Sequence, residues 1–468
     1  MILQLIGSNR VHDLQNLCLL FFPLSNFSEE DGNRLTVRLG ATEAQAVFEC
    51  AAGRFEATAP YQPSRFDGER LALKRAAYDA LSAATGLHSP WGLLTGIKSA
   101  LYYQKLQQQY AENAARVMQA DYLVEPPKIE LCKKILQQRA PAVNLCGEKN
   151  VSLYISIPFC PSRCRYCSFV SSATSSEGDL LDLYLDCLCR ELVYKAQLIR
   201  QGGYRVLSLY IGGGTPTVLN ECQLKRLLEQ VAQSVDLSHL LEYTVEAGRP
   251  DTITETKLDL LKAFGVNRIS VNPQTLNDTV LKIIGRNHTV KDFFDAYEKS
   301  CQKQFDINID VIAGLPGDTL ESFSESFSKI VSLQPADITL HTLYVKRGAD
   351  YGMEHMIPKQ EQAFLTGQMV SFAEETCDRN VYLPYYLYRQ KSMAGNLENV
   401  GYASPGKAGI YNILIMEEKQ TIVALGAGSI TKRVFPDGRI ERCDNVKDVG
   451  LYIEKIDEMI KRKRELFT

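Results

Sequence analysis

The stretch VSLYISIPFCPSRCRYC, residues 151–167, decides how the rest of this chain is interpreted. Its first seven residues are rich in valine, leucine, tyrosine and isoleucine, which at this length is typical of a buried β-strand. Three cysteines follow at the spacing Cys-x3-Cys-x2-Cys, in a loop that also holds a proline, a serine and two arginines. Because such a loop is a poor place for core packing, we interpret the cysteines as a metal-binding set.

Two kinds of metal site compete for these cysteines. A structural zinc site takes four ligands, but no histidine lies between His88 and His239 to complete one. In an iron–sulfur cube, three thiolates leave one of the four irons open to a small chelating molecule. The neighbouring Arg163 and Arg165 favour the thiolate form of cysteine. The residues therefore favour a cluster over zinc, with the ligands Cys160, Cys164 and Cys167.

Composition narrows the class of protein. The chain has 468 residues, 45% hydrophobic and 23% charged, so about two to four folding units are expected. Its net charge of −3 argues against a nucleic-acid partner. We expect no membrane span and no secretory leader, hence a cytoplasmic protein. In that compartment the 13 cysteines form no disulfide framework, and the ten outside the loop are interpreted as structural.

Four regions are expected along the chain. Residues 1–66 have the strands and turns of a small α+β unit, residues 67–145 are mainly helical, and residues 346–468 form a C-terminal α+β region. Between them, residues 146–345 alternate short apolar strands with amphipathic helices. The strands are expected at 151–157, 206–211, 243–246, 268–271, 307–312 and 338–343. This alternation predicts an α/β fold, a partial TIM-like (β/α)6 barrel with its chemistry at the carboxyl ends of the strands.

A glycine-rich segment and two acidic residues lie in or directly after these predicted strands. The segment GGGTPT, residues 212–217, allows the backbone to approach a ligand closely, and no glycine–lysine pair marks it as a phosphate loop. Glu246 ends the third strand, where a buried carboxylate is costly unless paired or used; an exposed strand end is the alternative. Asp310 interrupts an apolar run and needs a partner, such as Arg286 or the hydroxyl groups of a ligand.

Residues 154–167 resemble the signature of the radical S-adenosylmethionine (SAM) superfamily, in the family of oxygen-independent coproporphyrinogen III oxidases (HemN) and their relatives. The resemblance runs from about residue 151 to 430. The segments YYLYRQK, residues 385–391, and MEEKQ, residues 416–420, are most similar to the HemZ branch. The resemblance implies a radical SAM barrel that binds a [4Fe-4S] cluster and one or two molecules of SAM.

The resemblance also implies individual cofactor contacts. Gln274, Arg286 and Asp310 match residues that hold a second SAM, and Ile430 matches an adenine-side contact of the first, with an ordinary strand residue as the alternative. The full set of implied SAM contacts is Tyr154, Tyr166, Gly213, Gly214, Thr215, Glu246, Gln274, Arg286, Asp310 and Ile430. Four basic residues are candidate partners of substrate carboxylates, because arginine forks fit carboxylate geometry. They are Lys346, Arg347, Arg389 and Lys391.

The activity that this family implies is the oxidative decarboxylation of coproporphyrinogen III to protoporphyrinogen IX by a 5′-deoxyadenosyl radical, in heme biosynthesis. It requires a tetrapyrrole substrate and a low-potential electron donor of the flavodoxin or ferredoxin type. Phe169 stands where HemN has a fourth cysteine, which the heme-chaperone branch (HemW) also lacks. The chaperone motif His-Asn-x-x-Tyr-Trp has its counterpart at residues 398–403, which read ENVGYA. The alternatives are a heme-delivery protein and a radical enzyme for another tetrapyrrole.

Overall fold

The computed structural model describes residues 1–23, 25–27, 32–96, 98–167, 172–173, 178–344, 360–390 and 396–467. The chain forms two compact units. The first unit comprises Met1–Gln137, Pro358–Phe364 and Leu387–Asn399. The second unit comprises Gln138–Ile357, Leu365–Tyr386 and Val400–Thr468. In the described part of the chain, no helix has both the length and the apolar character needed to cross a membrane.

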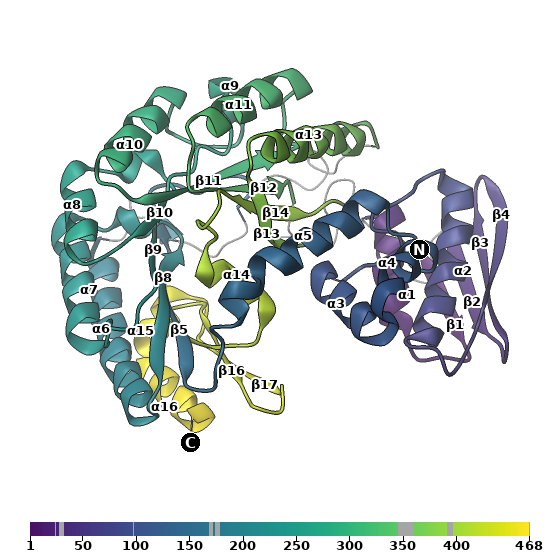
Figure 1. Ribbon diagram of the computed structural model, residues 1–468, viewed down its shortest axis with the longest axis horizontal. Coiled ribbons are helices and arrows are strands. Elements are labelled where there is room, and N and C mark those ends of the chain that lie inside the picture. The colour runs from purple at the N-terminus through teal and green to yellow at the C-terminus, as the bar shows by residue number, and fades with distance from the viewer. Residues whose placement is uncertain are drawn as a thin grey trace. The chain divides into compact units, whose positions relative to one another are not determined.

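The first unit contains a four-stranded sheet with its helices on one side (Figure 1). Its strands are β1 (Ile2–Ile6), β2 (Arg34–Leu39), β3 (Glu43–Cys50) and β4 (Gly53–Pro60). β1 and β2 are parallel, whereas β2, β3 and β4 form an antiparallel meander. Alternate residues of β2 and β3, among them Leu35, Val37 and Phe48, are fully buried. This apolar face is covered by the alanine-rich helix α2 (Gly68–Thr85), which lies against β3 and β4.

Further helices complete the first unit: α1 (Val11–Phe21), α3 (Ser99–Tyr110), α4 (Ala114–Ala120) and α5 (Pro126–Val143), the last of which continues into the second unit. The segment Leu387–Asn399 belongs to this unit through a buried ion pair. Nζ of Lys128 donates to the carboxylate of Glu398 at 2.5 Å, and Nε1 of Trp91 donates to the same carboxylate at 2.6 Å. A buried carboxylate is stable here because both of its oxygens have a donor.

An eleven-stranded sheet runs through the second unit (Figure 1). Seven neighbouring strands are parallel: β12 (Asp337–Thr342), β11 (Asp306–Ala313), β10 (Arg268–Ser270), β9 (Glu242–Glu246), β8 (Arg205–Gly213), β5 (Asn150–Ile157) and β15 (Thr421–Leu425). The two edges are formed by β13 (Leu383–Tyr388), β14 (Asn399–Ala403), β16 (Ile430–Val434) and β17 (Ile440–Asp444). The carboxyl ends of the parallel strands share one edge of the sheet, which is where their polar residues meet.

The six strands expected from the sequence are confirmed as β5 and β8 to β12, in the expected parallel order. A seventh parallel strand, β15, comes from the C-terminal region and extends the parallel sheet by pairing with β5. This pairing could not be read from local pattern, because it joins segments that are separated by most of the second unit. β15 places the loop that follows it beside the carboxyl end of β5.

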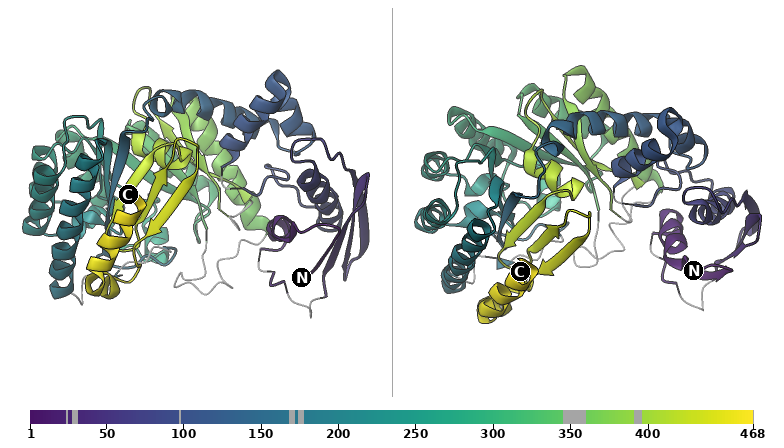
Figure 2. Two further views of the ribbon diagram at one scale, coloured as in Figure 1. Left: turned by 90° about the horizontal axis from the view of Figure 1, so that it is seen from below. Right: turned by 60° about the horizontal axis from the view of Figure 1, so that its bottom comes forward.

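Helices follow the parallel strands and lie along the outer side of the sheet (Figure 1). They are α6 (Gly178–Gln201), α7 (Glu221–Ser234), α8 (Glu255–Ala263), α9 (Asp278–Ile283), α10 (Val290–Gln302), α11 (Leu320–Ser332) and α13 (Gln360–Arg379). Their starts are encoded locally: Asn220 and Thr289 form capping boxes at α7 and α10. Near the C-terminus, α14 (Ile410–Glu417) precedes β15, and α15 (Val449–Glu454) and α16 (Ile456–Phe467) pack against α6 (Figure 2).

Candidate cluster and cofactor site

The three cysteines lie on the loop that follows β5. Its first part forms the short strand β6 (Phe159–Cys160), which pairs with β7 (Ser172–Ala173). Cys164 is buried, and Cys160 and Cys167 are half-buried. The amide of Cys167 donates to the carbonyl of Cys164 at 3.0 Å, and the hydroxyl of Thr215 donates to Sγ of Cys160 at 3.4 Å. The cysteine loop is therefore a defined turn that is anchored to the end of β8.

The donor set is compatible with an iron–sulfur cube. Among the residues that the structure describes, no three His, Cys, Asp or Glu side chains lie close enough together to hold a single ion. In a cube each thiolate binds its own iron, so the three sulfurs need not meet at one point. Two sulfurs have polar neighbours: Thr215 at Cys160, and Arg249, whose Nη1 lies 3.8 Å from Sγ of Cys164. Such outer contacts are typical of metal ligands.

The glycine segment after β8 packs against the start of the cysteine loop. Gly213 has a φ of 113°, in the region that favours glycine. A Cβ atom on Gly214 would lie 2.4 Å from the carbonyl oxygen of Phe159, so no side chain fits there. The amides of Gly214 and Thr215 donate to the carbonyls of Ile157 and Phe159 at 2.8 and 2.7 Å. The close approach that the structure shows is to the backbone of the cysteine loop, and the expected approach to a ligand stays a prediction.

Glu246 ends β9 in an aromatic setting. Its carboxylate accepts a hydrogen bond from the hydroxyl of Tyr210 at 2.6 Å. The Tyr210 ring stacks on Tyr411 and Tyr154, with centroid distances of 4.5 and 6.0 Å. Burial raises the pKa of Glu246 to about 7, although the bond from Tyr210 opposes this. The carboxylate is half-buried and paired, so the alternative of an exposed strand end does not hold.

Sequence reasoning did not single out Tyr210 and Tyr411. Tyr210 occupies a strand position and Tyr411 the first turn of α14, where aromatic residues are usually read as core. Glu242 holds α14 in place, because its carboxylate accepts from the amides of Ile410 and Tyr411 at 2.8 and 2.9 Å. Tyr154, predicted as a SAM contact, is thus one member of a three-tyrosine stack.

Gln274 has a strained backbone. Its φ of 68° is unusual for a residue other than glycine and costs about 1–3 kcal/mol, a cost that concentrates at functional sites. The strain is held by two bonds to β11: the amide of Gln274 donates to the carbonyl of Asp310 at 3.1 Å, and its carbonyl accepts from the amide of Ile312 at 3.0 Å. Gln274 and Asp310 are therefore brought together, as expected for one site.

Arg286 and Asp310 do not form the ion pair that the sequence suggested. The guanidinium of Arg286 donates to the carbonyls of Gly248 and Asn272, both at 2.9 Å, and to the hydroxyl of Tyr166 at 3.1 Å. Asn272, which sequence reasoning missed, connects the two residues, because its side-chain amide donates to Asp310 at 2.8 Å. Nε of Arg286 is buried without a hydrogen-bond partner. That orphaned donor is a feature that a polar ligand would satisfy.

Asp310 is instead surrounded by neutral donors and one histidine. Asn308 donates to its carboxylate at 2.8 Å, and Nε2 of His341 lies 3.7 Å away. Burial raises the pKa of Asp310, but the hydrogen bond and charge of His341 and the bond from Asn308 outweigh this and lower it. The carboxylate therefore stays ionised and keeps the capacity to accept hydrogen bonds from ligand hydroxyls.

Ile430 is the first residue of β16 and follows the Gly426–Ser429 loop. Its side chain is 41% exposed, although it is large and apolar. The loop before it is held by the hydroxyl of Tyr184, which accepts from the amide of Ala427 at 3.0 Å and donates to the carbonyl of Ser156 at 2.8 Å. Ser156 belongs to β5, so this loop lies beside the strand that leads to the cysteines. An exposed apolar side chain at such a place suits contact with a flat ligand ring.

The structure describes only one of the four basic residues proposed for the substrate. Lys346, Arg347 and Lys391 lie outside the described residues, as does Phe169. Arg389 belongs to the first unit, where it donates to the carbonyls of Leu94 and Asn396 at 2.7 and 3.0 Å and stacks on Trp91. Burial lowers the pKa of Arg389 to about 10.

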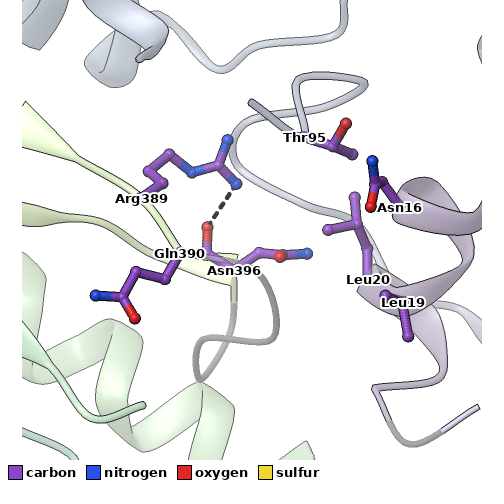
Figure 3. A pocket seen from close by; sticks show the side chains of 7 residues that line it. All are labelled: Asn16, Leu19, Leu20, Thr95, Arg389, Gln390 and Asn396. Atoms are coloured by element: carbon purple, nitrogen blue, oxygen red, sulfur yellow. Dashed lines mark hydrogen bonds between the residues drawn. The ribbon is translucent and has the colours of Figure 1, made fainter. Parts of the chain in front are cut away.

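Arg389 also lines a small pocket of the first unit (Figure 3). The other side chains around it come from α1 and from the chain near Thr95 and Asn396. Figure 3 shows the guanidinium of Arg389 turned toward the Asn396 carbonyl, to which it is hydrogen-bonded. These contacts give Arg389 a role in holding the segment Leu387–Asn399 within the first unit.

Comparison with known proteins identifies the family. A model of the radical SAM superfamily matches residues 154–330. The oxygen-independent coproporphyrinogen-III oxidase-like protein HemZ of Bacillus subtilis (strain 168) is 39% identical over 398 residues, which cover 83% of this chain and 79% of that protein. The heme chaperone HemW of the same organism is 36% identical over 220 residues, 45% of this chain and 57% of HemW.

Two further matches, one of sequence and one of structure, are to coproporphyrinogen III oxidase of Escherichia coli. The oxygen-independent coproporphyrinogen III oxidase of strain K12 is 33% identical over 216 residues, 46% of each chain. The solved structure of coproporphyrinogen III oxidase (HemN) superimposes with a TM-score of 0.54 at 23% identity, over 68% of this chain and 72% of HemN, which demonstrates a shared fold. The signature, the fold and the extended identity with HemZ together establish that this chain belongs to the radical SAM superfamily, in its family of HemZ-, HemN- and HemW-like proteins.

Proposed function

We propose that the protein is a radical SAM enzyme that decarboxylates coproporphyrinogen III to protoporphyrinogen IX in heme biosynthesis. The observation that carries this proposal is the 39% identity with HemZ over 83% of the chain. The site supports it, because the cysteine loop, the glycine segment, Glu246 and Arg286 are connected by hydrogen bonds at adjoining strand ends. The substrate would be a tetrapyrrole, and the electron would come from a low-potential donor of the flavodoxin or ferredoxin type.

Membership of the radical SAM family implies a [4Fe-4S] cluster and SAM. In the proposed site Cys160, Cys164 and Cys167 hold the cluster. A bound cluster and SAM would supply a 5′-deoxyadenosyl radical able to remove a hydrogen atom from a substrate propionate; loss of carbon dioxide and of one electron, passed to an electron acceptor, would then leave a vinyl group. The chain's own residues would bind and orient the cofactor: Gly213 to Thr215 would bind the amino acid part of SAM, Glu246 would contact the bound cofactor, and Ile430 would lie on its adenine side.

A second SAM is proposed at Gln274, Arg286 and Asp310. The unpartnered Nε of Arg286 is a donor for a ligand carboxylate, and the ionised Asp310 is an acceptor for ribose hydroxyls. Tyr166 connects this group to the cysteine loop, because it accepts a hydrogen bond from Arg286 and stands next to Cys167 in sequence. A stoichiometry of two SAM per chain in anaerobic equilibrium dialysis would support the second site.

Heme delivery is the second candidate, because HemW is 36% identical to part of this chain. The position of the HemW motif histidine is taken here by Glu398, whose carboxylate is buried against Lys128 and Trp91. A residue committed to an internal ion pair is poorly suited to bind heme iron, so this observation favours the decarboxylase. A radical enzyme for another tetrapyrrole would share the same cluster site.

Product analysis separates these functions. Anaerobic incubation of the reconstituted protein with SAM, a reductant and coproporphyrinogen III should yield a product that has lost two carboxyl groups, detected by mass spectrometry. Tight heme binding without any such product would contradict the decarboxylase and support heme delivery. Turnover of a different tetrapyrrole, with coproporphyrinogen III left intact, would contradict the proposed substrate but support the proposed radical chemistry.

SAM binding should weaken as the pH falls below about 7. Glu246 has a pKa near 7, raised by burial, so its carboxylate is ionised above that pH and neutral below it. Only the ionised form attracts the cationic cofactor. The affinity for SAM should therefore fall by about tenfold for each pH unit below the pKa of Glu246. The measurement is the SAM dissociation constant between about pH 6 and 8 in anaerobic protein.

Two variants complete this test. Glu246→Gln should bind SAM weakly with a flat pH profile, because the amide does not titrate in this range. Glu255→Gln, which alters an exposed carboxylate at the start of α8, should retain the profile of the unmodified protein. A pH dependence that survives in Glu246→Gln would remove Glu246 from the SAM site.

A further inference from the structure

A buried arginine that the proposed function does not use contacts the cysteine loop. Arg249 follows β9, three residues after Glu246, and its side chain is only 3% exposed. Its Nη1 donates to the backbone carbonyl of Ser162 at 3.1 Å, and its Nη2 donates to Oγ of Ser162, also at 3.1 Å. Ser162 lies between the first two cysteines. The same Nη1 lies 3.8 Å from Sγ of Cys164, within reach of an N–H···S hydrogen bond.

The guanidinium is itself held in a fixed orientation. Asp251 accepts from Nε at 3.1 Å and from Nη2 at 3.3 Å, so the carboxylate grips one edge of the planar fork. The opposite edge then faces the cysteine loop. Asn287 donates to the same Ser162 hydroxyl at 3.4 Å, which supports the loop from a second side. An arginine bound in this bidentate way has little rotational freedom, so its remaining donors act at fixed positions.

We propose that Arg249 is a positioning residue for the iron–sulfur cluster, which it serves by fixing the loop at Ser162 and by donating an N–H···S hydrogen bond to the Cys164 thiolate. Reduction adds negative charge to a cluster, and a nearby cation and sulfur-directed donor stabilise the reduced form more than the oxidised form. Arg249 therefore raises the reduction potential and eases electron entry. The inference rests on the proposed cysteine ligands and is independent of which tetrapyrrole is the substrate.

The test measures the midpoint potential of the cluster in anaerobically reconstituted full-length protein, by redox titration followed with electron paramagnetic resonance. Arg249→Lys keeps the positive charge but cannot bind Asp251 and Ser162 together, and Arg249→Gln removes the charge as well. Both midpoints should shift to more negative values, and the glutamine variant should shift further. Iron and sulfide content, measured in parallel, reports how well each loop still holds the cluster.

Arg268→Lys is the matched control. Arg268 is also a buried arginine bound to carboxylates, those of Asp337 and Glu242, but it stands at the amino end of β10, away from the cysteine loop. Its midpoint should equal that of the unmodified protein.

Two results would contradict or support the proposed positioning role of Arg249. A full cluster with an unchanged midpoint in both Arg249 variants would overturn the proposal. Loss of the cluster from folded Arg249 variants, with Arg268→Lys fully loaded, would support the positioning role. If the unmodified protein carried no cluster, the cysteine assignment would fail instead, which distinguishes the two failures.

Discussion

Replacing Cys164 by serine should abolish cluster assembly and lower 5′-deoxyadenosine formation by more than about 100-fold. Loss of a contact outside the metal ligands already costs roughly 10–100-fold, and a serine hydroxyl is a much poorer iron ligand than a thiolate. Cys164 is the most buried of the three cysteines, and its carbonyl accepts from the amide of Cys167, so the fold of the loop can survive the change. The measurements are iron and sulfide per chain and 5′-deoxyadenosine by mass spectrometry under reducing, anaerobic conditions.

The matched control is Cys222→Ser, which alters an exposed cysteine of α7 outside the loop. It should keep the iron content and the product yield of the unmodified protein. If Cys164→Ser retained both, or if the unmodified protein were isolated with one zinc and no sulfide, the cluster assignment would be refuted. Equal losses in the two variants would point to general thiol damage rather than to a ligand.

The parallel core of the fold was predictable because its information is local. In sequence, a helix lies between each two successive parallel strands among β5 and β8 to β12, and a parallel crossover of this kind has one handedness. The place of β15 was not predictable in the same way. Residues 421–425 have the pattern of a strand, but whether they pair with β5 depends on how the strands and helices that lie between the two segments in the sequence pack. The loop that carries Ile430 to the site is therefore a product of long-range packing.

The candidate site was predictable where unusual residues stand in apolar strands or close together. The three cysteines, Glu246 and Asp310 are of this kind. Tyr210, Asn272 and Arg249 were missed because a polar or aromatic residue near a strand end resembles an ordinary surface or core position. Their importance comes from partners far along the chain: Arg249 contacts the loop 87 residues earlier.

The basic candidate Arg389, whose role toward a substrate stays a prediction, has neighbours that local pattern does not show. A charged residue beside a tyrosine run suggests a ligand surface, but burial depends on which segments pack around it. In the structure Leu94 supplies a carbonyl and Trp91 a ring, from a region about 300 residues earlier in the chain. No local pattern in residues 385–391 predicts these neighbours.

A second large effect is expected at a buried ion pair near the loop that leads to Ile430. Glu191 of α6 and Lys463 of α16 are both fully buried, with Nζ of the lysine 2.9 Å from the carboxylate. The same carboxylate accepts from the amide of Gly426 at 2.9 Å, from the hydroxyl of Tyr452 at 2.7 Å and from Nδ2 of Asn445 at 3.1 Å. Glu191 thus joins the C-terminal helices to the loop after β15.

Lys463→Met should destabilise the protein by about 3–5 kcal/mol near neutral pH, because it leaves a buried carboxylate without its cation. Burial raises the pKa of Glu191, but the charge of Lys463 and the surrounding hydrogen bonds outweigh this and lower it. A lowered pKa contributes stability above the pKa of the unfolded state, and this contribution is lost as the pH falls through the folded value. The deficit of Lys463→Met should therefore narrow only below the pKa of an unfolded glutamate, about 4.3, as measured by urea unfolding at about pH 7 and pH 3.5.

Asp457→Ala is the control, because it removes an ion pair between the same two helices in an exposed setting. Arg190 of α6 lies 2.6 Å from Asp457 of α16, and the two side chains are 55% and 84% exposed. Water screens such a pair, so its loss should cost no more than about 1 kcal/mol and show little dependence on pH. The two pairs join the same helices but differ in burial and in the further hydrogen bonds that Glu191 accepts. If Lys463→Met also lost no more than about 1 kcal/mol of unfolding free energy, α16 would be held by packing alone. Glu191 would then not need a cation to remain ionised beside Gly426.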